Sequence, residues 1–469
     1  MSGEAHRPAD RETIRGLVAK YDQPGPRYTS YPTAVELSEE VGLDVYEQKL
    51  EEADALGDAP LSLYMHLPFC EEQCLFCGCH VIITPHHERS RPYLDLLKKE
   101  MALVAEKLPH RRRFAQLHLG GGTPTYYSPE ELDSLVGALL DDYSPLEGAE
   151  LAVELDPRVT SKEHLDVLAE RGFNRMSLGV QDFTPSVQEK VNRVQSLDET
   201  RAVIEHGRRR GYRGINVDLI YGLPLQTPKS FEETVEQVIG MGVDRVACYS
   251  FAYVPWLRGH QKKLDTGELP STEVKAELFA LARERFLAAG YEPIGMDHFA
   301  KPDDDLARAS QQARLKRNFQ GYAVVPGDDV IGFGISAIGD VRGALIQNEK
   351  KLSSYTEAIE ANQLPVARGI VRSRDDVIRG EVIHSLMCNF VIECSDVEAA
   401  WNIDFREYFS DALERLERYR DEGLVLIDRE RIRATPTGEL FVRNLAMCFD
   451  RYMWEKHADS DKPTFSRTV

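Results

Sequence analysis

The strongest constraint on the fold is a regular alternation of strand-like and helical segments between residues 61 and 251. The strand-like segments are Leu61–Leu67, Gln116–Leu119, Glu150–Leu155, Asn174–Val180, Gly214–Tyr221 and Arg245–Phe251. The helical segments between them are Arg91–Leu108, Pro129–Tyr143, Ser161–Arg171, Leu197–Arg210 and Ser230–Gly240. Because a crossover helix brings the chain back to start a parallel strand, this pattern predicts a parallel α/β sheet. It fits either an open doubly wound sheet or a partial barrel, and both place chemistry at the carboxyl ends of the strands.

The regions on either side of this alternation differ from it in character. After about residue 350 the sequence predicts helices at Asp375–Asn389, Asp396–Ala400 and Tyr408–Glu422, a hairpin at Gly423–Asp428 and Arg431–Thr435, and a helix from Thr437 to about Ala446. Helices followed by a hairpin suggest a winged-helix-like unit. We therefore expect three regions: an N-terminal extension at 1–60, the α/β domain at 61–350 and a mainly helical C-terminal domain at 351–469.

The charge and hydropathy of the chain exclude several classes of protein. The 57 Lys and Arg residues are outnumbered by 77 Asp and Glu residues, which gives a formal net charge of −20. Such a surface repels phosphate backbones, so we expect no nucleic-acid partner and a packing or lid role for the C-terminal domain. No apolar segment is long enough for a membrane helix or a signal peptide, so we expect a cytoplasmic protein with no membrane partner. Nothing in the pattern indicates an oligomer, and a monomer is expected.

Four of the 8 cysteines lie within ten residues of one another, directly after the first strand. Cys70, Cys74 and Cys77 have the spacing C-x₃-C-x₂-C, and Cys79 follows two residues later. A structural zinc site usually draws its four ligands from two separated pairs, and no second pair exists, although Cys79 or His80 are candidates for a fourth ligand. An iron–sulfur cluster is held by cysteine thiolates, and three of them would leave one iron open. The spacing favours the iron–sulfur cluster over zinc.

The cysteine motif, with an aromatic residue before its third cysteine, is the signature of radical S-adenosylmethionine enzymes. Further segments occur in the order typical of one family: RYTSYPT, YMHLPFCEEQCLFCGC, HLGGGTPTY, ELDPR, NRMSLGVQDF, VNRVQ, NVDLIYGLPLQTP, IGMDHFAKPDD, RNFQGY, SAIG, QNEK and MCFDRY. In these segments the chain resembles the oxygen-independent coproporphyrinogen III oxidases of haem biosynthesis. The resemblance extends from about Tyr21 to the last residues.

The resemblance implies a partial (β/α)₆ barrel of the radical S-adenosylmethionine type, followed by a helical C-terminal domain. It implies one [4Fe–4S] cluster per chain, ligated by Cys70, Cys74 and Cys77, and two molecules of S-adenosylmethionine per active site. The implied reaction is the decarboxylation of two propionate groups of coproporphyrinogen III to vinyl groups, started by a 5′-deoxyadenosyl radical. It requires an electron donor, which we expect to be of the flavodoxin or ferredoxin type.

The resemblance also assigns expected roles to individual residues. Positions that match the first S-adenosylmethionine site are Tyr64, Gly121, Glu154, Ala252 and Ile338, and those that match the second are Phe76, Gly122, Thr123, Gln181, Arg193 and Asp218. Taken alone, the triple glycine is often only a tight turn, Glu154 a salt bridge at a strand end, and Ala252 and Ile338 core residues. The three glycines lack a Cβ, which lets a ligand approach the backbone. Arg193 is expected to pair with a carboxylate.

Candidates for the catalytic and substrate-binding residues are less directly indicated. We expect Cys79, His66, Tyr64 and Glu154 to act near the reacting atoms, since alternation along the first strand points His66 toward the site. A purely structural role is the alternative for Cys79 and His66. The substrate has four carboxylates, for which we expect Arg27 and Arg317, with Phe319 and Gln320 nearby. The segment around Arg27 is expected to cover the barrel mouth.

Two other functions remain compatible with the cysteine motif. Haem chaperones of the same superfamily keep the motif but generally lack the RYTSYPT extension and a cysteine at the position of Cys79. A radical methyltransferase or cyclopropanase would use the same paired cofactors. Formation of S-adenosylhomocysteine during turnover would distinguish methyl transfer.

Overall fold

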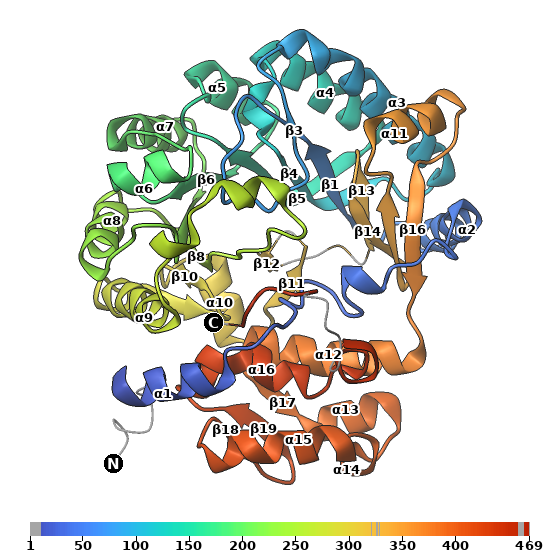
Figure 1. Cartoon of the computed structure of the whole chain (residues 1–469). Coiled ribbons are helices and arrows are strands. Elements are labelled where there is room, and N and C mark those ends of the chain that lie inside the picture. Colours follow the sequence, from blue (N-terminus) through green and yellow to red (C-terminus); the bar gives the residue numbers. More distant parts are fainter. Residues whose placement is uncertain (1–10, 320, 325–326, 328, 458–463, 469) are drawn as a thin grey trace.

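The large domain is built around one sheet of twelve strands, of which seven neighbouring strands are parallel (Figure 1). The computed structural model describes residues 11–319, 321–324, 327, 329–457 and 464–468. The six expected strands are β1 (Leu61–Leu67), β4 (Arg113–Gly121), β5 (Ser144–Leu155), β6 (Arg175–Gln181), β7 (Gly214–Tyr221) and β8 (Arg245–Ser250). They are neighbours in this order and pair in parallel throughout. The prediction of a parallel α/β sheet is confirmed, and β1 and β7 have the predicted bounds.

The expected crossover helices lie outside the sheet (Figure 1). They are α3 (Arg91–Lys107), α4 (Pro129–Asp142), α5 (Lys162–Glu170), α7 (Leu197–Arg209) and α8 (Pro228–Gly240), with the short α6 (Pro185–Lys190) before α7. Four of them begin with a Ser or Thr side chain that accepts a hydrogen bond from the third helical residue, which bonds back to the cap. These capping boxes satisfy amide groups that the first turn leaves unpaired, and they fix where each strand-to-helix loop ends.

Both ends of the parallel sheet are extended by strands that the sequence pattern did not reveal. Beyond β8 lie β10 (His298–Ala300) and β9 (Glu292–Ile294), both antiparallel to their neighbours. Beyond β1 lies the parallel β13 (Asp329–Phe333), followed by the antiparallel β14 (Ile338–Val341), β15 (Ala344–Asn348) and β16 (Val366–Val371). In the described residues the edge strands β9 and β16 do not pair with each other, so the sheet stays an open, partial barrel. It also continues past residue 350, where the sequence placed the boundary of the domain.

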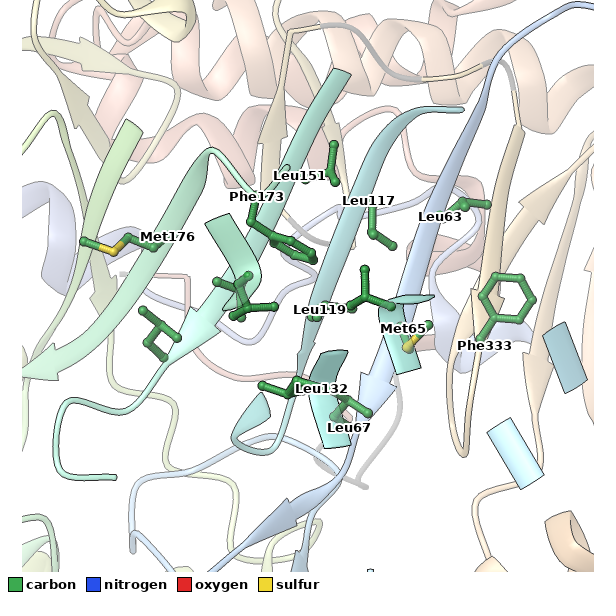
Figure 2. Packing of buried hydrophobic residues seen from close by; sticks show 14 of the residues in the cluster. Leu63, Met65, Leu67, Leu117, Leu119, Leu132, Leu151, Phe173, Met176 and Phe333 are labelled. Carbon is green, nitrogen blue, oxygen red and sulfur yellow. The ribbon is translucent and has the colours of Figure 1, made fainter. Parts of the chain in front are cut away.

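Alternation along β1 separates core residues from site residues. Leu61, Leu63, Met65 and Leu67 are at most 2% exposed and pack under the helices, and Figure 2 shows three of them beside Leu117 and Leu119 of β4. The residues between them, including Tyr64 and His66, therefore point to the concave side of the sheet, because successive strand residues face opposite sides. The predicted orientation of His66 follows from this packing.

The C-terminal domain contains more elements than the sequence predicted. Its helices are α12 (Arg374–Asn389), α13 (Cys394–Trp401), α14 (Phe405–Tyr408), α15 (Ser410–Asp421), η6 (Gly438–Phe441), α16 (Val442–Met447) and η7 (Met453–His457). The helix expected at Tyr408–Glu422 is divided at Phe409, which leaves the helical conformation. The hairpin of β18 (Val425–Ile427) and β19 (Arg431–Ala434) is present, and β17 (Val391–Glu393) adds a third strand beside β19.

The N-terminal extension is shared between two hydrophobic cores. The helix α1 (Arg11–Tyr21) and the following Tyr28 and Tyr31 pack into the core of the C-terminal domain. The helix α2 (Leu43–Asp54) packs instead into the core of the large domain through Leu50 and its neighbours. A short turn, η1 (Ala34–Glu36), joins these two parts. The extension thus links the two domains, and the first ten residues lie outside the described part of the chain.

The remaining elements are short or lie between the two domains. These are β2 (Phe69–Cys70), β3 (Ile82–Ile83), η2 (His87–Arg89), η3 (Pro124–Tyr126), η4 (Gly259–Lys263), η5 (Thr266–Glu268), α9 (Thr272–Ala288), α10 (Asp305–Gln311), β11 (Lys316–Asn318), β12 (Gly321–Ala323) and α11 (Leu352–Glu360). Within the described ranges, no helix has the length and apolar character needed to cross a bilayer.

Candidate active site

The cysteine loop lies at the carboxyl end of β1. After Pro68 the chain forms β2, which pairs with β3 and closes the loop that carries the four clustered cysteines. Cys70, Cys74, Cys77 and Cys79 are all free thiols, and all four line a cavity of about 380 Å³. Sequence reasoning placed the chemistry at this end of the sheet, and the structure places the cysteines and the cavity together there.

Donor groups surround the sulfur atoms of the three expected cluster ligands. Guanidinium nitrogens of Arg193 and Arg158 lie 3.6 and 3.8 Å from Sγ of Cys74. The hydroxyl of Thr123 lies 3.4 Å from Sγ of Cys70, and the amide of Cys79 donates to Sγ of Cys77 over 3.4 Å. Such donors stabilise thiolates, which are the form that binds iron.

The thiols of Cys70 and Cys77 differ in acidity because their surroundings differ. A hydrogen bond from the Cys79 thiol lowers the pKa of Cys77 to about 7, whereas burial raises the pKa of Cys70 to about 12. In the described residues no three His, Cys, Asp or Glu side chains converge on the position of one metal ion. A four-iron cluster places its ligands around a cube and does not need that convergence, so the donor set fits the cluster.

The triple glycine ends β4 and permits close contacts between protein atoms. A Cβ on Gly120 would lie 2.8 Å from Oε1 of Glu154, and one on Gly121 would lie 2.5 Å from Cε1 of His66. A Cβ on Gly122 would lie 2.6 Å from the backbone of Pro68, and Gly121 has a φ of +113°. The glycines are therefore needed to bring β4 against the cysteine loop, in addition to the access to a ligand that we expected from them.

Glu154, at the end of β5, is anchored on both carboxylate oxygens. It accepts a hydrogen bond from Nε2 of His118 over 2.9 Å and one from the amide of Gly121 over 3.2 Å. Burial raises the pKa of Glu154, but the bond to His118 and the charge of that ring outweigh burial, so the net pKa is lowered. Glu154 is thus an anion facing the cavity, which suits an ammonium or a ribose hydroxyl.

Asp218 and Gln181 face the same cavity from the next two strands. Asp218, on β7, accepts hydrogen bonds from Asn216 over 2.8 Å and from Ser177 over 3.2 Å. Burial, followed by the charge of Glu154, raises the pKa of Asp218 to about 6. Gln181 has a φ of +70°, and its buried Oε1 has no hydrogen-bond partner in the described part of the chain. An unpaired buried acceptor is costly, so this atom is suited to receive a bond from a ligand.

Arg193 is already engaged by the protein. Its guanidinium donates to Asp156 over 2.9 Å and to the carbonyl of Gly179 over 2.6 Å. Asp156 also binds Arg158, so one carboxylate holds both cations beside Cys74. Sequence reasoning missed His118, Asp156 and Arg158, although Asp156 and Arg158 lie in the quoted ELDPR segment and His118 in the quoted HLGGGTPTY.

Tyr64 and His66 form a hydrogen-bonded chain along the concave side of β1. Nε2 of His66 bonds the carbonyl of His80 over 2.9 Å and must carry the proton there. Its Nδ1 therefore accepts from the hydroxyl of Tyr64 over 2.9 Å. Burial lowers the pKa of His66 to about 4, so the ring is neutral near pH 7.

The other expected site residues lie at different places. Phe76, Gly121, Gly122, Thr123 and Arg193 line the cavity, whereas Tyr64, Ala252 and Ile338 are not among its lining residues. The carbonyl of Ala252 accepts from Gln261, and Ile338 pairs with Gln347 in β15, so the structure brings neither into the cavity.

The expected substrate residues lie nearer the C-terminal domain. Arg317 has a side chain only 4% exposed, stacks on Tyr322 at 4.7 Å, and leaves Nε and Nη1 without hydrogen-bond partners in the described residues. Tyr322 lines a second chamber of about 140 Å³, which shares Glu154, Ser177 and Asp218 with the first cavity. Arg27 donates to the carbonyl of Ser250 at the end of β8. Phe319 follows β11, and Gln320 lies outside the described residues.

Comparisons with known proteins agree with this geometry. The model of the radical SAM superfamily matches residues 64–238, and that of the HemN C-terminal domain matches residues 373–441. The oxygen-independent coproporphyrinogen III oxidase of Pseudomonas aeruginosa is 42% identical over 467 residues, covering 98% of this chain and 100% of the relative. That of Escherichia coli is 41% identical over 453 residues, covering 97% and 98%.

A solved structure gives the same result. The coproporphyrinogen III oxidase of Escherichia coli, described as a radical SAM enzyme, superimposes with a TM-score of 0.88 at 40% identity, covering 93% of this chain and 98% of that one. Full-length similarity at this identity confirms the resemblance seen in the sequence motifs. The chain belongs to the family of oxygen-independent coproporphyrinogen III oxidases.

Proposed function

We propose that this protein converts two propionate side chains of coproporphyrinogen III to vinyl groups without oxygen, giving protoporphyrinogen IX for haem biosynthesis. The observation that carries the proposal is one cavity that contains the three cluster cysteines, the glycine turn and the carboxylates of Glu154 and Asp218. This cavity lies in a chain whose full-length relatives bear the name of that oxidase.

Cys70, Cys74 and Cys77 would hold a [4Fe–4S] cluster, and the cavity beside them would hold two molecules of S-adenosylmethionine. When bound, the cluster and S-adenosylmethionine supply a one-electron cleavage and the 5′-deoxyadenosyl radical that removes a hydrogen atom from a propionate. The carboxylate of Glu154 is ionised and faces the cavity, where it would bind an ammonium or hydroxyl group of the first molecule. The open Oε1 of Gln181 and the carboxylate of Asp218 would serve the second.

The chain's own groups would position the substrate and exclude side reactions. Neutral His66, fixed by Tyr64 and by the carbonyl of His80, keeps a proton on Nε2 and offers no charge to the reacting region. Cys79 lines the cavity and hydrogen-bonds the Cys77 sulfur, so we assign it to the region next to the cluster. Nε and Nη1 of Arg317 make no hydrogen bond within the described residues, although Nη1 lies 4.0 Å from Oδ1 of Asp297. The guanidinium, stacked on Tyr322 at the wall of the second chamber, would suit a propionate that enters there.

Arg27 ties the N-terminal segment to the end of β8, at the same face as the cavity. We assign the RYTSYPT segment with Arg27, together with Arg317 and Phe319, to the substrate side of the site. Gln320, also expected there, lies outside the described residues. The protein is proposed to work as a monomer that receives electrons from a separate carrier protein.

An anoxic turnover assay tests the function. The chain, reconstituted with iron and sulfide, receives S-adenosylmethionine, a one-electron reductant, a cell extract and coproporphyrinogen III. We expect two 5′-deoxyadenosine and two CO₂ per protoporphyrin. Deoxyadenosine without porphyrin product, under conditions that support an established member of the family, would contradict the decarboxylation, and S-adenosylhomocysteine would indicate methyl transfer. An Arg317→Gln variant is expected to raise the KM for the porphyrinogen more than it lowers kcat.

A further inference from the structure

A basic and apolar loop lies directly on the cysteine loop. The segment after β8, residues 251–264, crosses the mouth of the barrel in Figure 1, where it is coloured yellow-green and includes η4. His260 Nε2 bonds the carbonyl of Cys77 over 2.9 Å, and Arg258 Nε donates to the carbonyl of Gly78 over 2.8 Å. Gln261 donates to the carbonyl of Phe76 over 3.3 Å. This loop is therefore the protein layer immediately outside Cys77.

The outer surface of this loop combines positive charge with exposed apolar side chains. Trp256 and Leu257 are 44% and 62% exposed, and Lys262 and Lys263, in η4 of the same loop, are also exposed. Residues 254–264 contain no acidic residue, although the whole chain has a net charge of −20. This loop therefore carries a positive charge, opposite in sign to the net charge of the whole chain.

The positive region continues across the adjacent loop. Lys350 is exposed, and its carbonyl accepts a hydrogen bond from His80, three residues after Cys77. Arg258 bonds the carbonyl of Gly78, two residues before His80, so Arg258 and Lys350 are both held by one short segment of the cysteine loop. Exposed apolar side chains that share a loop with several cations have the composition of a docking site for an acidic partner.

We propose that the surface formed by Trp256, Leu257, Arg258, Lys262, Lys263 and Lys350, here called the donor face, docks an acidic flavodoxin-type protein. This inference rests on the proposed function, which requires one electron for each cleavage. The carrier's reduced flavin gives one electron, and the cluster held by the three cysteines takes it, with no bond formed or broken. The apolar edge of an exposed flavin would contact Trp256 and Leu257, and the acidic residues around the flavin would face the cations of the donor face.

Geometry favours a carrier protein over the substrate as the occupant. None of the residues of the donor face lines the cavity or the second chamber, whose walls are Glu154, Asp218 and their neighbours. Tunnelling rates fall steeply with distance, so a carrier gains from docking on the layer next to Cys77. Electron-transfer complexes bury small interfaces and are transient, so a donor face of six residues is compatible with one.

The test uses the cluster-loaded full chain and the double variant Lys262→Glu with Lys263→Glu. A matched control is Arg209→Glu with Arg213→Glu. Both residues are exposed at the end of α7 and in the following loop, at the opposite end of the barrel, and the control changes the net charge equally. Reduction of the cluster by reduced flavodoxin is followed by visible absorbance and by electron paramagnetic resonance, with dithionite as a second reductant.

We expect the lysine variant to lower the rate of cluster reduction by flavodoxin about ten-fold to a hundred-fold at low ionic strength. The deficit should shrink as salt is added, since screening weakens the attraction in the unchanged protein. The control variant, and reduction by dithionite, should match the unchanged protein. Equal slowing in both variants, or none in the lysine variant, would overturn the proposal.

Two further outcomes would also overturn it. A raised KM for coproporphyrinogen III with dithionite as reductant, at an unchanged rate of reduction by flavodoxin, would assign the lysines to the substrate. A deficit with an acidic iron–sulfur carrier but not with flavodoxin would show that the carrier class is wrong. Failure of the proposed function is seen separately, as absence of protoporphyrin with dithionite in the unchanged protein.

Discussion

The buried carboxyl group of Glu100 allows a quantitative prediction of how stability depends on pH. It lies on α3, is 2% exposed, and accepts hydrogen bonds from the amide of Gly334, from Asn348 and from the hydroxyl of Tyr355 over 2.6–2.7 Å. The same helix carries Tyr93, whose hydroxyl donates to the carbonyl of His66. These contacts hold the turn between β13 and β14 against the carboxyl end of β1, next to the site.

Burial raises the pKa of Glu100 from 4.5 to about 7, although its three hydrogen bonds oppose that change. A carboxyl group whose pKa is raised in the folded state carries no electrostatic cost at low pH, where it is protonated in both the folded and the unfolded states. The folded state is therefore more stable at low pH than at high pH with respect to this group. That advantage is lost as the pH rises from 4.5 through 7. Linkage gives a loss of roughly 2.5 kcal/mol between pH 5 and pH 8 from this residue.

The variant Glu100→Gln removes the titration. Its amide oxygen, placed where Oε2 lies, still accepts from Gly334 and Tyr355, while the bond from Asn348 to Oε1 is lost at every pH. We therefore expect the free energy of local unfolding, relative to that of the unchanged protein, to rise by roughly 2.5 kcal/mol from pH 5 to pH 8. Hydrogen exchange of peptides covering residues 331–349, corrected for the intrinsic effect of pH, measures this difference. The variant can differ from the unchanged protein by a constant free energy of unfolding at all pH values. Only the part of the difference that changes with pH reports on the titration of Glu100.

A matched control is Glu106→Gln, an exposed position on the same helix. It should leave the pH dependence of exchange unchanged. If Glu100→Gln gives a difference in unfolding free energy that does not depend on pH, then Glu100 is ionised without cost and the reasoning about burial is refuted.

Three further predictions concern the site. Gly122→Ala places a Cβ 2.6 Å from backbone atoms that cannot move aside easily, so less iron should be retained after reconstitution, and a full complement of iron would contradict this. His118→Phe removes the partner of Glu154 and should weaken S-adenosylmethionine binding about tenfold in calorimetry, with a larger effect at lower pH as the carboxyl protonates. Arg158→Gln removes one of two cations held by one carboxylate beside Cys74, so the cluster's reduction potential should become more negative in a redox titration. An unchanged or more positive potential would contradict it.

The regular part of the fold could be predicted because local signals agree with the tertiary structure. Apolar strands, crossover helices and Ser or Thr caps repeat with the same order, so strand pairing followed from the pattern. The strands β14–β16 were missed because they are short and antiparallel, and they depend on pairing with β13 rather than on their own sequence. The division of the helix at Phe409 was missed because the break results from packing in the C-terminal core.

In the site, too, residues that act through tertiary contacts were harder to predict than residues in a local motif. The position of the clustered cysteines at the end of β1 was predictable, since their spacing carries the chemistry, and several of the residues expected from the resemblance line the cavity beside them. His118 and Asp156 were not predictable, because their importance lies in contacts with Glu154 on the neighbouring strand and with Arg193 in the loop after α6. The glycines were expected to admit a ligand, and only the structure shows that protein atoms occupy the space next to them.

The two faces of strand β1 lead us to expect that stability and function are coupled in this protein. In β1 the residues Leu63 and Met65 fill the core, while their neighbours Tyr64 and His66 lie on the concave side of the sheet, where His66 packs against Gly121 of the cavity wall. A change in core volume must move the strand, since packed interiors have few voids to absorb it. Tyr93 on the covering helix bonds the carbonyl of His66 and so transmits such a shift directly to the site. Core substitutions under β1 therefore disturb the active site without any contact with a cofactor.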